Sequence, residues 1–375
     1  MAVPRHQLVD PTTPGYYHCI TRCVRRAFLC GLDPLSGRSF DHRKSWIESR
    51  LIELAEIFGV GLYAYAVMSN HVHAVVHVDP GTAAGWPDSE VAERWVRLFP
   101  ASANGEPDPE GCLRRRDAIL GNPDRLAQCR LRLRSLSWFM RCLAEPIARR
   151  ANREDGCTGR FWEGRFKCQA LLDDAAVLSC MSYVDLNPVR AGIAPDLPSS
   201  THTSVKRRIE TTSPPARGEP LRAIAGSIIE PTLPVALVEC LALVDWTDRT
   251  TRPDKRGAIR SDAPPVLARI GLRPRQWQVQ VLGTESRYWR DRSGQSTAGE
   301  GRRDRATLAQ GYRHDARVAG STGRGGRLVA GGLVAARRTC LSRSRQATLT
   351  RRAAAGPQQS TKPRHAKAVA VGGLS

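Results

Sequence analysis

Two histidines separated by one residue, His71 and His73, form the first group of side chains that could do chemistry. They lie in an apolar run, 71–78, whose β-branched residues predict a strand. Because residues i and i+2 of a strand point to the same face, the two imidazoles project side by side and could hold one divalent ion. Two ordinary polar side chains on a solvent-facing strand would show the same spacing. His77, about 13 Å further along the same face, is expected to be exposed or hydrogen-bonded and not a ligand.

Tyr183 and Asn187 form the second group. They are four residues apart in a helical pattern, so the phenol and the amide share one helix face. A tyrosine can accept a phosphoryl group when a metal ion polarises the phosphodiester, because the leaving group and the ion then share the cost of ionising a phenol. Core packing of Tyr183, with its hydroxyl at the rim, and a helix C-terminal role for Asn187 remain the simpler explanations of each residue alone.

The hydrophobic pattern predicts the elements that position these groups. Alternation of apolar residues predicts strands, and apolar residues three and four apart predict helices. The expected strands cover residues 15–23, 61–68, 71–78 and the end of 156–172, and the expected helices cover residues 45–58, 133–152 and 173–186. Pro146 predicts a kink or a break, and Asn187-Pro188 predicts the end of the last helix. This order of elements predicts a small α+β sandwich with an antiparallel sheet.

The charge of the chain is divided unevenly. The 375 residues carry a formal charge of +21. Residues 291–375 contain 17 Lys and Arg against 4 Asp and Glu, a net +13, and have no Phe, Ile, Trp or Met. Such a composition predicts a disordered basic tail, because it offers little apolar surface to bury. The remaining 290 residues, with a net charge of +8, are consistent with binding to nucleic acid or another polyanion, which charge alone does not prove.

Other classes of protein are excluded by simple features. No apolar run approaches the ~20 residues that span a bilayer, and the N-terminal residues lack the apolar segment of a secretory signal. The 11 cysteines are scattered without a CxxC pair, which argues against a zinc ribbon and favours reduced, mostly buried thiols in a cytosolic protein.

Four motifs in order resemble the HUH single-tyrosine transposases, and most closely the REP-associated tyrosine transposases with the IS-element-type transposase domain. The resemblance covers residues 15–195, about half the chain. The motifs are YHCITR at 17–22, VMSNHVH at 67–73, GRFWE at 159–163 and YVDLNPVRAG at 183–192.

The resemblance implies a fold and a mechanism. The implied fold is the HUH endonuclease fold, a ferredoxin-like or RRM-like antiparallel sheet with helices on one side. His71 and His73 look like the metal ligands, and Asn187 takes the position of a third, amide ligand. Tyr183 looks like the nucleophile, which attacks single-stranded DNA and leaves a 5′-phosphotyrosine link and a free 3′-OH. Mg²⁺ or Mn²⁺ would be the cofactor, although two imidazoles and an amide suit other divalent ions too.

Basic residues near these motifs are candidates for DNA contacts. Cations beside aromatic side chains suit a single strand, through phosphate contacts and base stacking. Core packing of Phe161 and Trp162 is the competing explanation. His18 could lie near the site, but a packed strand histidine is the favoured explanation. The proposed DNA-binding residues are Arg160, Arg165, Lys167 and Arg190.

The sequence predicts three regions. Residues 1–197 would form the catalytic domain, with an insertion at about 80–155. Residues 198–290 would form an accessory, mostly helical region, entered through a Ser/Thr/Pro-rich linker at 195–222. Residues 291–375 would be the basic tail, whose abrupt Arg/Gly/Ala/Ser composition also fits a frameshifted reading of a GC-rich gene.

The expected function is that of a transposase that nicks and rejoins single-stranded DNA at hairpin or palindromic sequences. A replication initiator or relaxase would share the chemistry, and a catalytically silent, domesticated transposase that binds DNA is the alternative from another class. The expected partner is DNA and not a membrane. The protein is expected to be a monomer or homodimer, cytoplasmic and associated with the nucleoid.

Overall fold

The computed structural model describes residues 9–24, 30–33, 37–211, 218–228, 233–251 and 263–290, with side chains described up to residue 284. The described residues belong to one compact unit, residues 1–296. The predicted basic tail, and with it the frameshift hypothesis, lies outside the described residues.

A five-stranded sheet in the order β6-β1-β3-β2-β7 forms the centre of the unit. Every pairing in it is antiparallel. Its strands are β1 (Gly15–Arg22), β2 (Val60–Val67), β3 (His71–Val78), β6 (Lys167–Leu171) and β7 (Ala225–Gly226). A separate hairpin pairs β4 (Ser102–Ala103) with β5 (Glu106–Pro107). The α+β class and the antiparallel sheet predicted from the sequence are confirmed.

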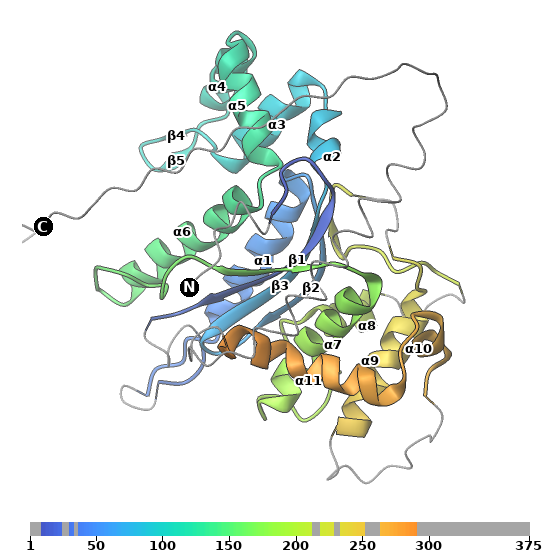
Figure 1. The fold of residues 1–375 in the computed structure, drawn as a ribbon. Coiled ribbons are helices and arrows are strands. Elements are labelled where there is room, and N and C mark those ends of the chain that lie inside the picture. The colour runs from blue at the N-terminus through green and yellow to red at the C-terminus, as the bar shows by residue number, and fades with distance from the viewer. Residues whose placement is uncertain are drawn as a thin grey trace, which may run out of the picture. The chain divides into compact units, whose positions relative to one another are not determined.

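Helices cover both faces of the sheet, where the sequence predicted helices on one side (Figure 1). One face packs against α1 (His42–Ile57) and α6 (Leu136–Glu154), and the other packs against α7 (Asp174–Arg190). The reason is visible in β2, where all eight residues are buried. A strand with apolar side chains on both faces needs a cover on both faces.

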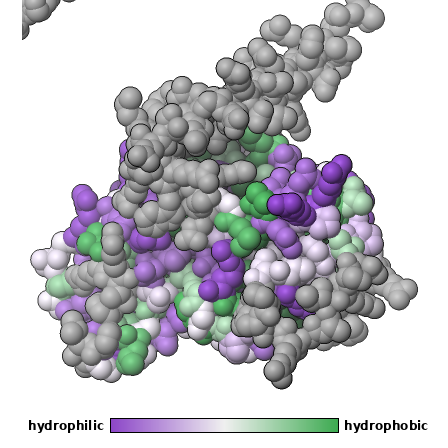
Figure 2. Space-filling model, turned by 60° about the horizontal axis from the view of Figure 1, so that its bottom comes forward, coloured by the Kyte–Doolittle hydropathy of each residue, from purple (hydrophilic) through white to green (hydrophobic). Residues whose placement is uncertain are grey.

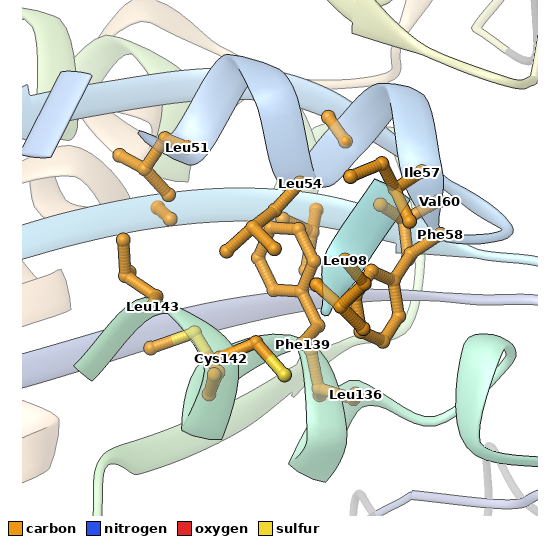
Figure 3. Packing of buried hydrophobic residues seen from close by; sticks show 14 of the residues in the cluster. Leu51, Leu54, Ile57, Phe58, Val60, Leu98, Leu136, Phe139, Cys142 and Leu143 are labelled. Carbon is orange, nitrogen blue, oxygen red and sulfur yellow. The ribbon is translucent and has the colours of Figure 1, made fainter. Parts of the chain in front are cut away.

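The core on the α1 and α6 side is aromatic and aliphatic. Figure 3 shows side chains from both helices meeting, with Phe58 and Phe139 in edge-to-face contact at a centroid distance of 5.7 Å. Leu51 and Leu54, one helical turn apart on α1, are fully buried here. Apolar residues at this spacing are what predicted the helix from the sequence.

The tyrosine helix α7 runs past the point where the sequence predicted its end. It begins after Asp173, whose carboxylate accepts from the Ala176 N–H, as predicted for an N-cap. Pro188 lies inside the helix, which ends at Arg190. The cost of the missing N–H is offset by burial of Pro188 and Val189, and the Pro188 carbonyl accepts from two N–H groups beyond the helix.

The insertion is built from short helices. One of them is α3 (Asp88–Leu98). Neither α4 (Pro109–Leu120) nor α5 (Pro123–Leu133) was predicted from the sequence. Each of these two begins with a side-chain cap followed by proline. A further short helix, α2 (Pro80–Ala84), follows β3.

The residues predicted as a linker include a helix that packs on the sheet, α8 (Ser204–Thr211). The Ser204 hydroxyl accepts from the Tyr65 N–H on β2, and its one proton lies within reach of both the Tyr65 carbonyl and the Asp185 carboxylate on α7. Arg208 donates to the Tyr63 carbonyl. Polar side chains attach this segment together with the buried Val205, and the small number of apolar residues explains why its hydrophobic pattern gave no helix signal.

Most of the described residues from 233 onward are helical, as the sequence predicted for this region. Trp277 is fully buried there, and its indole N–H donates to the Thr247 hydroxyl at 2.9 Å. The helices of this region are α9 (Leu237–Thr251), α10 (Pro265–Arg269) and α11 (Pro274–Arg290). They join the hydrophobic cluster on the α7 side of the sheet.

A fully buried guanidinium links the first helix to the end of α6. Arg43 forms ion pairs with Glu154, at 2.7 Å, and with Asp155, and lies 4.1 Å from the Phe40 ring centroid. Removing one partner of a buried ion network leaves the remaining charges uncompensated.

Arg43→Met is therefore expected to lower the free energy of unfolding by about 3 kcal/mol, measured by urea denaturation. Arg149→Met is the matched control, because Arg149 pairs with Glu145 but its side chain is 69% exposed. The control should change stability by no more than about 0.5 kcal/mol. Equal effects of the two substitutions would show that the Arg43 network is not a stability element.

The surface, the cysteines and the lengths of the helices each add one observation. Figure 2 shows hydrophilic and hydrophobic residues interspersed over the described part of one face. The cysteines in the described ranges form no disulfide bonds with one another. Among the helices that the structure describes, none combines the length and the apolar composition that a membrane span requires.

Candidate functional site

The candidate site lies on the face of the sheet that α7 covers. Cross-strand pairing sets its layout: His73 is opposite Ile20, His71 is opposite Arg22, and Ile20 is also opposite Lys167 on β6. Directly opposed residues of antiparallel strands share a face. The two histidines of the motif therefore lie on one face, as the sequence predicted, and two basic residues from neighbouring strands share that face with them.

His73 joins three elements of the fold. Its Nε2 lies 3.1 Å from the Asn187 Nδ2 on α7, and its Nδ1 lies 2.9 Å from the His18 Nε2 on β1. His73 is 2% exposed and His18 is fully buried. The sequence predicted that His73 and Asn187 meet, whereas for His18 it favoured a packed strand histidine over a place near the site.

His71 is half-buried at the edge of the site. Its Nδ1 lies 2.5 Å from the Asn70 Oδ1, and its ring centroid is 4.7 Å from that of His73. A carboxamide oxygen can only accept, so the His71 Nδ1 carries the proton, and in the neutral ring Nε2 keeps its lone pair.

The histidines are held in their neutral form. Burial lowers the pKa of His18 to about 3, with the nearby His71 adding to the shift. Burial, and then the positive charges of Arg22 and Lys167, lowers the pKa of His71 to about 4. The pKa of His73 is lowered well below its ordinary value, mainly by burial. Neutral imidazoles have lone pairs available for a cation at neutral pH.

Tyr183 lies beside the histidines but is covered. Its ring centroid is 5.6 Å from that of His73 and 6.2 Å from that of His18, both in edge-to-face geometry. The residue is 3% exposed and belongs to the hydrophobic cluster on this side of the sheet. Its position therefore matches both explanations given by the sequence, a nucleophile near the histidines and a packed core tyrosine.

Asp185, between the tyrosine and the asparagine, faces another helix. Its carboxylate accepts from the Ser204 hydroxyl and from the Val205 N–H at 3.0 Å. Burial raises the pKa of Asp185 to about 6, against the lowering effect of the Ser204 hydrogen bond. This contact attaches α7 to the start of α8, and it fixes the face of α7 that Tyr183 and Asn187 present to the sheet.

Two of the four predicted DNA-binding residues lie close to this site. The Arg190 guanidinium carbon is 5.5 Å from the Tyr183 ring centroid, and the residue is exposed. Lys167 is half-buried on β6 and near enough to affect His71 electrostatically. Arg160 and Arg165 are exposed on the segment before β6, and no described contact joins them to the histidines.

The structure decides between the two explanations of Phe161 and Trp162, and it corrects the expectation for His77. Phe161 and Trp162 are buried, and the Trp162 indole donates to the Ala144 carbonyl at 2.8 Å, so core packing explains them and base stacking does not. His77 is buried and not exposed, with its ring 4.5 Å from that of Tyr16.

Two residues at the site were not predicted. His18 and Arg22 alternate along β1 on the face that carries His71 and His73. The alternation was readable, but the register that brings β1 beside β3 was not. Once that register is known, His18 is the diagonal neighbour of His73 on the adjacent strand, and its side chain can reach the His73 ring.

The donor set fits a divalent cation. Two neutral imidazoles and one carboxamide lie together, and the carboxamide would present its oxygen after rotation about its last bond. No group of three or more His, Cys, Asp or Glu residues arranged to hold a metal occurs in the described ranges, so a metal here would depend on Asn187 as the third protein ligand.

The histidines also predict how stability depends on pH. A histidine whose folded pKa is lowered binds its proton only on unfolding, so its contribution is present above about pH 6.5 and is lost as the pH falls toward the folded value. His18 loses its contribution to stability as the pH falls from 6.5 to about 3. His71 loses its contribution as the pH falls from 6.5 to about 4. Asp185 acts in the opposite direction: its folded pKa is raised, so its contribution to stability is present below pH 3.8 and is lost as the pH rises to about 6.

We therefore expect His71→Gln to reduce the slope of unfolding free energy against pH near pH 5 by about one proton, or about 1.4 kcal/mol per pH unit. Urea denaturation at several pH values between 4.5 and 7 measures it. His42→Gln serves as the control, because the side chain of His42 is 46% exposed. An unchanged slope for His71→Gln would contradict the neutral, buried state of this ring.

Comparisons with known proteins give little. No protein-family model and no curated protein matches the chain. One solved structure, described as a REP-associated tyrosine transposase bound to a REP hairpin, matches 56% of this chain and 86% of its own, at 12% identity and a TM-score of 0.29. The function proposed below therefore rests on the motifs and on the geometry of the site.

Proposed function

We propose that this protein cleaves and rejoins single-stranded DNA at hairpin or palindromic sequences, with Tyr183 as the nucleophile. The observation that carries the proposal is the contact between His73 on β3 and Asn187 on α7, at 3.1 Å. This contact brings the histidine motif and the tyrosine-helix motif, which are far apart in sequence, together at one site. Asn187 lies one helical turn from Tyr183.

The residues have separate roles in the proposed reaction. The Tyr183 oxygen attacks phosphorus, the bond from phosphorus to the 3′ oxygen breaks, and that oxygen leaves as a 3′-OH. The phosphodiester is conserved as a 5′-phosphotyrosine, so rejoining by a 3′-OH needs no ATP. Arg190, Lys167 and Arg22 surround the site with positive charge for the phosphates.

A divalent cation such as Mg²⁺ or Mn²⁺, held by His71, His73 and Asn187, would polarise the scissile phosphate. The chain itself prepares this site by keeping both histidines neutral and by setting the Asn187 amide against the His73 Nε2. Burial, with a further contribution from the charges of Arg22 and Lys167, lowers the pKa of His71 and keeps the ring neutral, which leaves its Nε2 lone pair available for the cation.

The second candidate is a catalytically silent DNA-binding protein. The burial of Tyr183, at 3% exposure, favours it, because a phosphate reaches the hydroxyl only after the covering residues move. Basic side chains at the site would then serve binding alone.

Cleavage separates the two candidates. The protein is incubated with end-labelled hairpin oligonucleotides in Mn²⁺ and in EDTA, and products and covalent complexes are resolved on denaturing gels. The proposal predicts cleavage at one position with a protein-linked 5′ product in Mn²⁺ only. Tight hairpin binding with intact DNA in both buffers would favour the silent binder.

A further inference from the structure

We infer that His18 is a positioning residue for His73: its Nε2 accepts the Nδ1–H of His73 and thereby directs the lone pair of the His73 Nε2 at Asn187. The proposed function gives this contact its catalytic meaning. The contact itself can be tested without DNA or cleavage.

The tautomer follows from the two hydrogen bonds of one ring. The His73 Nε2 faces the Asn187 Nδ2 at 3.1 Å, and a carboxamide nitrogen can only donate. A cation at the same nitrogen would need the same lone pair. In either case the proton of the neutral His73 ring is on Nδ1, and the atom 2.9 Å away that can accept it is the His18 Nε2.

Packing keeps this arrangement in place. The His18 and His73 rings are nearly coplanar, with centroids 5.2 Å apart and planes at 20°, so they meet edge to edge as the hydrogen bond requires. His18 is fully buried and His73 is 2% exposed, so water does not compete for the bond. A neutral imidazole has one acceptor nitrogen, and in His18 the nitrogen that faces His73 is Nε2.

Metal-binding histidines commonly donate their second ring N–H to an acceptor in the protein, which fixes the tautomer and the ring orientation. His71 meets that requirement through Asn70, at 2.5 Å. His73 meets it through His18. Each histidine of the motif thus has its own acceptor, one from the adjacent residue and the other from the neighbouring strand.

The experiment measures the tautomer and the metal affinity separately. Long-range ¹H–¹⁵N spectra of the full chain, labelled at histidine and assigned with His73→Gln, report which nitrogen of His73 carries the proton. Mn²⁺ affinity is measured by electron paramagnetic resonance. His18→Phe keeps an aromatic ring without an acceptor, His18→Gln restores an acceptor near the Nε2 position, and His77→Phe is the control for a buried histidine on the same face.

The inference predicts that His73 is protonated at Nδ1 in the wild type and in His77→Phe. It also predicts that Mn²⁺ binding weakens about 10- to 100-fold in His18→Phe and recovers to within about threefold in His18→Gln. A wild-type His73 protonated at Nε2 would overturn the inference, as would unchanged Mn²⁺ affinity in His18→Phe. A wild-type protein in which His73 carries the Nδ1 proton but which binds no Mn²⁺ would contradict the proposed metal site and would confirm the His18 contact.

Discussion

Tyr183→Phe is expected to abolish the covalent protein–DNA adduct, with a loss of at least about 1,000-fold, while hairpin affinity stays within about threefold. The substitution removes one oxygen and keeps the ring that packs 5.6 Å from His73. Because the oxygen is the proposed nucleophile, no other atom at this position can form the phosphoester bond. Adduct formation on denaturing gels measures the first quantity, and fluorescence anisotropy with a labelled hairpin measures the second.

Tyr63→Phe is the matched control for this experiment. Tyr63 is fully buried in the same hydrophobic cluster as Tyr183, but its ring contacts are with Tyr16 and His77. Its variant should form the adduct at close to the wild-type rate. An adduct that survives in Tyr183→Phe, or one that is lost equally in both variants, would exclude Tyr183 as a specific nucleophile.

The second large effect is expected from the cation ligands. His73→Ala and Asn187→Ala should each lower the Mn²⁺-dependent cleavage rate by at least about 100-fold, because each removes one of the three donors proposed to hold the ion. Single-turnover cleavage at increasing Mn²⁺ concentration measures this. A partial recovery at high Mn²⁺ would show that the lesion is in ion binding.

His77→Ala is the control for the ligand variants. His77 lies on the same strand and the same face as His73, and it packs against Tyr16. Its variant should keep the wild-type dependence on Mn²⁺. If His73→Ala and Asn187→Ala cleaved like His77→Ala, the contact between the two motifs would be a packing feature, and the metal assignment would be wrong.

The central strands and the tyrosine helix could be predicted from local patterns. The run 71–78 alternates its polar residues, and Asp173 precedes an apolar helix with an acidic cap. These signals depend only on neighbouring residues, so they survive in the folded chain. The meeting of His73 and Asn187 was predicted from the family resemblance and not from local pattern.

The features that could not be predicted depend on distant contacts. Pro188 continues α7 because the fold buries it, which no local rule reports. Ser204 begins a helix in a segment predicted as a linker because Tyr65 and Asp185 bind its side chain. His18 joins the site through the pairing of β1 with β3, and strand register is not encoded by either strand alone.

Some missed elements carried readable signals. Asp108-Pro109 and Asn122-Pro123 each place a capping side chain before a proline, and each begins a helix, α4 and α5. A cap followed by proline is a recognised start of a helix. The weak apolar periodicity of α4, which buries only Ile119, explains why the helical pattern itself was not seen.

The most direct test of the central claim is to locate the covalent bond. The adduct formed with a hairpin oligonucleotide in Mn²⁺ is digested with nuclease and trypsin and analysed by tandem mass spectrometry. Tyr183 is the one tyrosine in the tryptic peptide of residues 168–190. The proposed function predicts that this peptide carries a nucleotide 5′-phosphate on Tyr183. A nucleotide on any other residue, or no modified peptide from a cleaved substrate, would contradict it.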